Sequence, residues 1–224
     1  MSGVAVKAEV RLGRGELDLV VDLDLAPGDR CVLAGANGSG KSTLLKVLAG
    51  LVNPVDGRIE IDGVAAAGAG VKPTRPEHRS VGYLPQERAI FPHLTVWGNV
   101  AYPLRGRGLR RNEVASRTEE MVQTFGLTAI AALPGAHLSG GQAARTGLAR
   151  ALAGDPGLLL LDEPFAALDP SAVVELRELL AGWLDQTGQT CLMVSHDLDD
   201  AQAGRGRVIV LAEGRILTRQ NRHY

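Results

Sequence analysis

Residues 35–43 read Gly35-Ala36-Asn37-Gly38-Ser39-Gly40-Lys41-Ser42-Thr43, and this stretch decides the fold. It matches the P-loop pattern, in which a glycine and four further residues precede Gly-Lys-Ser/Thr. An apolar run, residues 31–34, comes before it, and a helix-forming run, residues 44–49, comes after it. A strand, a glycine-rich loop and a helix in this order predict an α/β fold with a nucleotide-binding core.

The glycines of this loop suit it to hold a polyphosphate. Because Gly35, Gly38 and Gly40 lack a Cβ atom, the backbone can wrap around an anion with successive N–H groups pointing inward. The loop also lies at the positive end of the helix that follows. The predicted nucleotide-binding residues are Gly35, Asn37, Gly38, Ser39, Gly40, Lys41, Ser42 and Thr43.

Three polar side chains close the loop. Lys41 can reach the β- and γ-phosphates of a nucleotide, the hydroxyl of Ser42 can ligate Mg²⁺, and Thr43 is placed to help at the phosphates. A glycine-rich turn without a ligand is the alternative, and a lysine followed by two hydroxyls argues against it. We expect ATP and Mg²⁺ as cofactors.

Composition limits the other classes. The chain has 224 residues, 45% hydrophobic content and a formal net charge of −1, which suit a single domain, residues 1–224. No basic run predicts nucleic-acid binding, and the apolar runs are strand-sized, so we expect a cytoplasmic protein. Cys31 and Cys191 fall in predicted interior strands, where a buried thiol is the simplest interpretation.

Periodicity and turn signals predict the remaining elements. Residues 4–10 and 17–25 predict an antiparallel hairpin, and residues 58–62, 80–84, 158–161 and 190–194 predict further strands. Residues 208–211 and 215–217 predict a closing hairpin. The small side chains of residues 64–71 predict a flexible surface loop. Residues 89–136, with Thr95 as a helix N-cap, predict a helical insertion between core segments 1–88 and 137–224.

Polar residues follow three of the predicted interior strands. Asp162 and Glu163 end the run 158–161, Gln86 follows 80–84, and His196 follows 190–194. We expect Asp162 to hold Mg²⁺, Glu163 to orient or deprotonate the attacking water, and Gln86 to reach the metal ion or this water. His196 is a candidate for contacting the γ-phosphate. Solvated strand ends and a structural histidine are the alternatives.

A second anion site is predicted at Ser139, Gly140, Gly141 and Gln142, which open another helix. Only the first of the two anion sites has a lysine, Lys41, next to a predicted strand. The second site therefore suggests a role at a nucleotide that is held elsewhere. A simple N-cap with a glycine turn is the alternative, and without further context it is the favoured one.

Taken together, these motifs resemble the ATP-binding cassette (ABC) ATPases over essentially the whole chain. The motifs are residues 35–43, Gln86, the Leu-Ser-Gly-Gly-Gln run 138–142, residues 159–164, 167–169 and His196. The resemblance implies an ATPase core with a mainly parallel sheet, an antiparallel edge and a small helical subdomain. It also implies a head-to-tail dimer in which each ATP lies between one subunit's P-loop and the other's signature, the run 138–142. Asp169 would lie at the interface.

Residues 79–86, 91–96 and 99–100 look like those of bacterial importer ATPases for small ions and solutes, and residues 12–13 resemble the molybdate and related oxyanion systems. The implied partners are ATP, a second identical subunit and membrane permease subunits, with the protein peripheral on the inner face of the membrane. An exporter ATPase, or a non-transport ATPase acting on nucleic acid or ribosomes, is the alternative. Many such importer ATPases carry a regulatory domain beyond the core, and this sequence stops at Tyr224.

Two surface expectations complete the sequence analysis. The apolar side chains of Phe91, Leu94 and Trp97 predict a docking site for a cytoplasmic helix of a membrane subunit, and packing inside the helical lobe is the alternative. The resemblance also places an adenine-stacking position near Leu12, where this chain has no aromatic side chain. We expect weak base recognition and a gain in ATP affinity on Leu12→Tyr.

Overall fold

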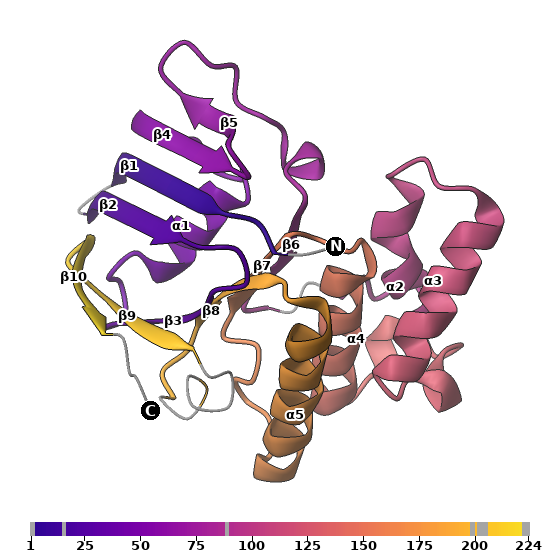
Figure 1. Cartoon of the computed structure of the whole chain (residues 1–224). Coiled ribbons are helices and arrows are strands. Elements are labelled where there is room, and N and C mark those ends of the chain that lie inside the picture. Colours follow the sequence, from indigo (N-terminus) through magenta and orange to yellow (C-terminus); the bar gives the residue numbers. More distant parts are fainter. Residues whose placement is uncertain (1–2, 15–16, 88–89, 198–199, 201–205, 221–224) are drawn as a thin grey trace.

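The computed structural model describes residues 3–14, 17–87, 90–197, 200 and 206–220 (Figure 1). Through these residues runs a ten-stranded sheet in the order β5-β4-β1-β2-β10-β9-β3-β8-β7-β6. The strands are β1 Val6–Arg14, β2 Leu17–Leu25, β3 Arg30–Ala34, β4 Asp56–Ile61, β5 Val64–Gly68, β6 Val81–Leu84, β7 Leu158–Asp162, β8 Thr190–Val194, β9 Arg207–Ala212 and β10 Arg215–Gln220. The longer helices are α1 Lys41–Leu48, α2 Val96–Arg105, α3 Arg111–Thr124, α4 Gly140–Ala153 and α5 Pro170–Thr187, and single 3₁₀ turns are η1 Pro76–His78, η2 Thr128–Ile130 and η3 Gly135–His137.

Strands β5, β4, β1 and β2 form an antiparallel part of the sheet. Along β1, Val6, Ala8 and Val10 are buried while Lys7 and Glu9 are exposed, so the predicted hairpin with one solvated face is confirmed. The antiparallel part joins the rest through β10, which pairs with β2 at one position, Arg215 with Val20. The turn that joins β1 to β2, at residues 15–16, lies outside the described residues.

The prediction of a flexible loop at residues 64–71 is wrong. Residues 64–68 form β5, paired with β4, and Ala66 and Ala67 are 4% and 1% exposed. The carbonyl of Ala66 accepts hydrogen bonds from the backbone N–H of Thr74 and from the guanidinium of the buried Arg79. The backbone ladder and these donors hold the strand, so small side chains are enough to fill the space beneath it.

The remaining strands, β9, β3, β8, β7 and β6, pair in parallel. Every residue of β7 and β8 is buried, which confirms two interior strands, and the bounds of β8 are those predicted. Parallel pairing aligns the carboxyl ends of β3, β6, β7 and β8 at one edge of the sheet. The residues that follow these ends therefore meet there.

Two hydrophobic cores lie on opposite faces of the parallel strands. One combines α1 and the antiparallel strands with one face of the parallel strands and includes Cys31. The other combines the opposite face with α2, α3, α4 and α5 and includes Cys191. Both thiols are buried, as predicted. Because the apolar residues of α1 are buried in the first core, this helix anchors the P-loop that precedes it to that core.

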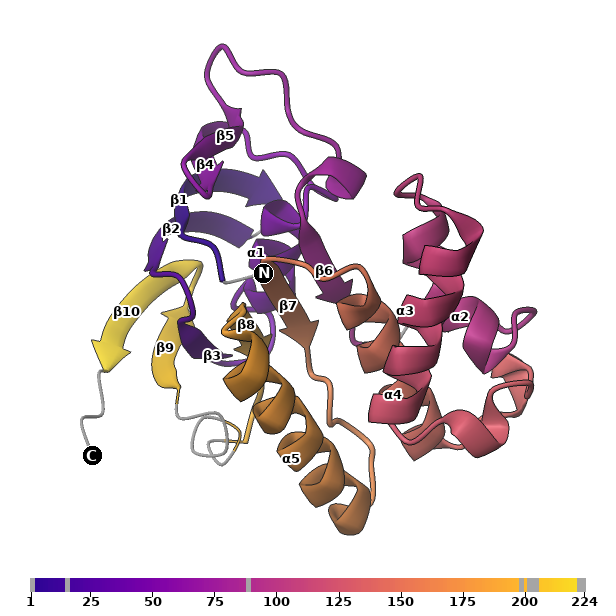
Figure 2. The same cartoon turned by 45° about the vertical axis from the view of Figure 1, so that its right-hand side comes forward.

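Helices α2, α3 and α4 gather on the side of the molecule away from β1, β2, β4 and β5 (Figure 2). The side chain of Thr95 caps α2 by accepting a hydrogen bond from the N–H of Gly98 at 3.0 Å, which confirms the predicted N-cap. Helix α4, which begins after residue 136, packs against both α2 and α3. The division of the chain at 89–136 stays a prediction, and its first boundary, at residues 88–89, lies outside the described residues. In the described part of the chain, no helix combines the length and apolar character needed to cross a bilayer.

Candidate functional site

The P-loop joins β3 to α1, as the sequence predicts. Gly40, with φ 103°, stands at the N-cap of α1, and Lys41 is the first helical residue. The Lys41 Nζ atom donates hydrogen bonds to the carbonyl oxygens of Gly35 and Ala36, each at 2.8 Å. The ammonium group therefore folds back across the loop, and the loop's own backbone holds it in place.

Lys41 lies in an environment that shifts its proton affinity. Burial lowers the pKa of the ammonium group, and the nearby carboxylates of Glu163 and Asp162 act in the opposite direction. Lys41 is 6% exposed. A cation with little access to water interacts strongly with an anion placed next to it, which is what a phosphate site requires.

Gly35 and Ser39 support the loop from behind. At Gly35, φ is 154° and a Cβ atom would lie 2.1 Å from the carbonyl oxygen of Leu211 in β9, so a side chain is excluded by the neighbouring strand. The carbonyl of Ser39 accepts a hydrogen bond from the N–H of Gly214. The buried Ser39 hydroxyl has no hydrogen-bond partner among the described residues. These contacts with the β9–β10 hairpin fix the shape of the loop.

A cleft of about 620 Å³ opens in front of the P-loop. Six of its lining residues come from the loop and the first turn of α1, and three come from other strand ends. They are Asn37, Gly38, Gly40, Lys41, Ser42, Thr43, Gln86, Glu163 and His196. The topology thus brings together most of the residues that the sequence predicts for the site.

Ser42, which lines this cleft, and Asp162, its hydrogen-bond partner, form a pair of candidate oxygen ligands for a metal ion. The Ser42 hydroxyl donates a hydrogen bond to Asp162 Oδ1 at 3.0 Å. Burial raises the pKa of Asp162, whose exposure is 2%, and the hydrogen bond from Ser42 lowers it. A hydroxyl and a carboxylate side by side fit Mg²⁺, which takes one or two protein oxygens and completes its shell with phosphate and water.

Glu163 is at the centre of a polar group that the sequence did not predict as a unit. Its Oε2 accepts a hydrogen bond from Gln86 Nε2 at 3.1 Å, and its Oε1 lies 2.9 Å from His196 Nε2. The backbone of Glu163 has φ 51°, and its N–H donates to the carbonyl of Val194 at 3.0 Å. The ends of β6, β7 and β8 therefore converge on one carboxylate.

The signature run 139–142 lies apart from this cleft. Ser139 caps α4 and forms a capping box with Gln142, in which each side chain accepts a hydrogen bond from the other residue's backbone N–H. A Cβ atom at Gly141 would lie 3.7 Å from the Cβ of Ala172, so the start of α4 neighbours the start of α5. Within the described residues, these groups form no part of the cleft lining.

Asp169 belongs to the region of the signature. Its carboxylate caps α5 by accepting hydrogen bonds from the Ser171 hydroxyl at 2.6 Å and the Ala172 N–H at 2.9 Å. These two bonds, that of Ser171 first, lower the pKa of Asp169. An ion pair between Arg145 of α4 and Glu175 of α5 also joins the two helices.

The expectation that an adenine stacks at the position of Leu12, and that a tyrosine there would strengthen ATP binding, is wrong. Leu12 is 6% exposed and packs in the first core, opposite Leu19. Its neighbours Arg11 and Gly13 face outward. The alternation of β1 assigns Leu12 to the inner face, so a tyrosine there would meet packed side chains instead of a base.

Sequence reasoning missed Arg177, which lies on α5 and contacts the turns after Glu163 and His196. An arginine on an amphipathic helix gives no motif, because its spacing is that of any solvated helix face. Only the tertiary structure identifies its neighbours.

Comparison with known proteins gives a consistent set of relatives. The model of the family described as ABC transporter matches residues 20–166. A thiamine import ATP-binding protein of Jannaschia sp. is 40% identical over 93% of this chain and 89% of its own length. A molybdate/tungstate import ATP-binding protein of Archaeoglobus fulgidus is 40% identical over 95% and 84%. An Fe(3+) ions import ATP-binding protein of Streptomyces avermitilis is 43% identical over 93% of this chain and 59% of its own length.

Solved structures resemble the whole chain. A dimeric ATP-binding cassette in a post-hydrolysis state, bound to ADP and Pi, superposes with a TM-score of 0.84 at 29% identity and covers 99% of this chain and 100% of that one. A second dimeric structure of the same cassette, described as a bacterial ABC transporter cassette, has the same TM-score at 28% identity and the same coverage.

Proposed function

Since this chain belongs to the ABC transporter family, we infer that it is the ATP-binding and ATP-hydrolysing subunit of an importer, driving a small solute or ion through a membrane permease. The observation that carries this function is that Lys41, Ser42 and the Glu163 group line one cleft, with Asp162 hydrogen-bonded to Ser42. A cation, oxygen donors and a carboxylate around one space are the parts that phosphoryl transfer to water needs.

We propose that the P-loop residues Gly35, Asn37, Gly38, Ser39, Gly40, Lys41, Ser42 and Thr43 bind the phosphates of ATP. Ser42, Asp162 and Gln86 are the candidate Mg²⁺ ligands. Mg²⁺, when bound, neutralises charge on the phosphate oxygens. The loop's backbone N–H groups and Lys41 hold the phosphates in line with the attacking water.

Glu163 is the proposed general base. Its carboxylate lies at the mouth of the cleft, where it can accept a proton from a water that attacks the γ-phosphate. His196, whose side chain is 49% exposed, has room to turn its Nε2 from Glu163 to a γ-phosphate oxygen. Gln86, freed from the same carboxylate, orients the water. Binding of ATP would thus release Glu163 from its hydrogen bond with Gln86 and its contact with His196 and leave it free to accept the proton.

A second copy of this chain is the proposed source of the signature. Ser139, Gly140, Gly141 and Gln142 lie outside the P-loop cleft of their own chain, and their helix N-terminus is a site for an anion. Both solved structures, which are of the same cassette, are dimeric. We propose a head-to-tail homodimer in which these residues close on the partner's ATP, with Asp169 at the interface.

The experiment that tests this function measures phosphate release from ATP by the purified chain. We expect release that requires Mg²⁺, is abolished by EDTA and returns when excess MgCl₂ is added, with the circular dichroism spectrum unchanged throughout. Protein shown to be folded and to release no phosphate at saturating Mg·ATP, alone or with permease, would overturn the assignment.

The membrane subunit is the other proposed partner, and contact with it places the protein at the inner face of the membrane. The predicted docking side chains of Phe91, Leu94 and Trp97 are half-buried, and Phe91 also packs against Tyr102, at 4.6 Å between ring centroids, and beneath Arg150, at 5.2 Å. Tyr102 is 54% exposed. The half-buried surface around Phe91 supports both docking and the alternative of packing within the helical lobe.

A charge substitution separates these two interpretations. Leu94→Glu combined with Tyr102→Glu should uncouple transport while basal phosphate release stays within about twofold, because neither side chain lines the ATP cleft. Loss of folding would instead support packing within the lobe. The names of the relatives include importers of molybdate/tungstate, thiamine and Fe(3+), and a molybdate-like oxyanion is our proposed solute.

A further inference from the structure

A cavity of about 170 Å³ lies beside Glu163 and His196, on the side of the turns that carry them. Arg177 of α5 lines the same cavity, together with residues of both turns. Where a cavity borders a side chain, few atoms pack against it, so its position depends on the contacts that remain. The position of both catalytic candidates therefore depends on how the two turns are held.

Arg177 holds the turn that follows β8. Its Nη2 donates a hydrogen bond to Asp197 Oδ2 at 2.5 Å, and its Nε donates to Asp200 Oδ1. Asp200 also accepts a hydrogen bond from the Ser195 hydroxyl, which in turn accepts one from the N–H of Asp197 at 2.9 Å. The residues on both sides of His196 thus belong to one network that ends at the guanidinium of Arg177.

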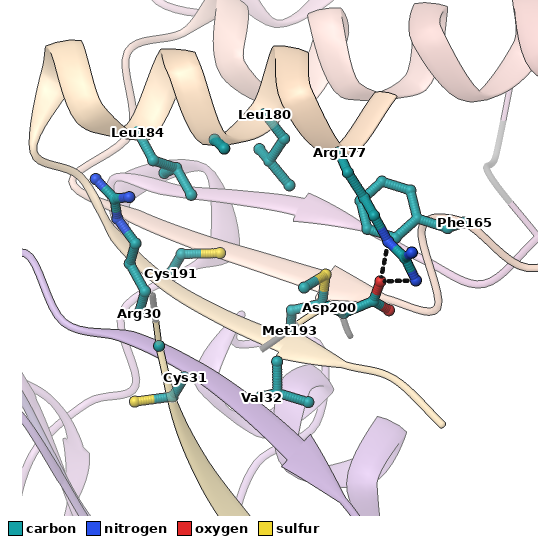
Figure 3. A pocket seen from close by; sticks show the side chains of 12 residues that line it. Arg30, Cys31, Val32, Phe165, Arg177, Leu180, Leu184, Cys191, Met193 and Asp200 are labelled. Atoms are coloured by element: carbon teal, nitrogen blue, oxygen red, sulfur yellow. Dashed lines mark hydrogen bonds and ion pairs between the residues drawn. The ribbon is translucent and has the colours of Figure 1, made fainter. Parts of the chain in front are cut away.

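The same guanidinium contacts the turn that follows β7. Its Cζ lies 5.7 Å from the ring centroid of Phe165, which is 8% exposed and follows Glu163 by two residues. Figure 3 shows Arg177 placed between the ring of Phe165 and the carboxylate of Asp200. One side chain therefore connects the turn of the proposed base with the turn of the proposed γ-phosphate contact.

We propose that Arg177 is a positioning residue for hydrolysis, which holds His196 in its contact with Glu163 beside the cavity. The proposal rests on the function proposed above for these two residues. An arginine suits this role because its planar fork presents separate nitrogens to two carboxylates and a flat face to a ring. A lysine has one compact ammonium group and cannot make the three contacts together.

The kinetic consequence follows from where Arg177 lies. It does not line the P-loop cleft, so its replacement should leave the affinity for ATP unchanged within about twofold. Displacement of His196 should instead slow the chemical step. Small displacements of a catalytic group reduce turnover by as much as about 100-fold, and we expect a fall in kcat of about tenfold.

The test compares Arg177→Lys with the matched control Arg30→Lys. Arg177→Lys keeps a cation next to the buried Asp200, which favours folding. Arg30 also ties α5 to the sheet, through Asp185 at 2.7 Å, and it lies outside both the cleft and the cavity. We expect tenfold lower kcat with unchanged ATP affinity for Arg177→Lys, and parental values for Arg30→Lys.

A double-mutant cycle adds a readout that a merely structural role would not move. In a His196→Ala background, measured over long incubations, Arg177→Lys should lower the residual rate by less than about twofold, because its partner is already absent. An equal loss in both backgrounds, or parental kcat for Arg177→Lys, would overturn the proposal.

Asp197→Asn is a second variant with little risk to folding, because the Asp197 side chain is 53% exposed. It should lower kcat by about threefold, and parental kcat here also counts against the proposal. Parental turnover of His196→Ala by itself would contradict the proposed function instead.

Discussion

Two helix N-termini in this chain carry glycine and serine, and they differ in what surrounds them. At α1, Lys41 crosses the loop, the Ser42–Asp162 pair lies beside it, and strand ends supply Gln86, Glu163 and His196. At α4, the side chains of Ser139 and Gln142 each accept a hydrogen bond from the other residue's backbone N–H, which forms a capping box. The first N-terminus has a cation, oxygen donors and a carboxylate around a cleft, whereas the second presents backbone donors and a hydroxyl at an exposed end.

This difference suggests that the two helix N-termini contribute differently to ATP binding and hydrolysis. A chain that binds and hydrolyses ATP needs charge neutralisation and a base, and both are present at α1. The α4 end can add only hydrogen bonds and the helix dipole to an anion that is already bound. We therefore propose that it serves as half of a site that a second chain completes. The predictions below act on one of the two ends or on the cap of α5 beside the second.

The largest effect is expected from Lys41→Ala at the first end. Removing the cation should weaken ATP binding by about 100-fold or more and leave no measurable turnover, because hydrogen bonds to two charged phosphates are lost together. Calorimetry measures the affinity. Lys46→Ala, in the last turn of the same helix and outside the cleft lining, is the control and should bind normally. Equal affinities of Lys41→Ala and its parent would remove the distinction between the two ends.

Glu163→Gln should separate binding from chemistry at the same end. The amide keeps the volume of the side chain but accepts no proton, so turnover should fall by about 10²- to 10⁴-fold while ATP affinity stays close to the parental value. Phosphate release under single-turnover conditions gives the rate. Near-normal turnover would show that another group acts as the base.

Ser139→Arg acts on the second end alone. In the Glu163→Gln background, Mg·ATP should shift the chain from monomer to dimer on a sizing column. The Glu163→Gln/Ser139→Arg double variant should not shift, because the arginine places bulk and charge where the partner's γ-phosphate docks. ATP affinity of the monomer should change by less than about twofold, since Ser139 does not line the cleft. An undiminished dimer peak would mean that the signature lies outside the interface.

The smallest effect concerns Asp169→Ala beside the signature. The folded-state pKa of Asp169 is lowered by the Ser171 hydroxyl and the Ala172 N–H, so its stabilising effect is fully present above the unfolded pKa of about 3.9 and is lost as the pH falls through the folded value. We expect a slightly lower Tm than the parent at pH 7 and a difference that closes below pH 4. Asp169→Asn, which keeps a capping oxygen, should stay closer to the parent at pH 7. A Tm difference that persists unchanged at pH 3 would argue against the cap.

The sequence predicted the parts of this molecule that depend on local pattern. The P-loop, the buried strands predicted at 158–161 and 190–194 and the cap at Thr95 follow from spacing and side-chain type. Strand β5 was missed because Ala66 and Ala67 carry no periodic signal, although a paired backbone buries them. The adenine-stacking position was placed at Leu12 by counting residues along the chain, but the alternation of inward and outward side chains along β1 turns Leu12 into the core.

The site shows the same limit. The strand ends that bring Gln86, Glu163 and His196 together were predicted one by one, but their hydrogen bonds to each other depend on sheet register. The crowding that excludes a side chain at Gly35 comes from Leu211, far away in the sequence. Contacts of this kind are set by tertiary packing and leave no trace in local composition.

Cross-linking between two copies tests most directly the claim that one chain's cleft is completed by another chain's signature. Chains carrying Asn37→Cys or Ser139→Cys, both exposed positions, are mixed in the Glu163→Gln background and treated with a short bis-maleimide; the native Cys31 and Cys191 are buried. We predict a covalent dimer that forms in the mixture, requires Mg·ATP and is absent when either variant is treated alone. Cross-linking that is equal without ATP, or absent from a mixture shown to bind ATP and to dimerise, would contradict the account.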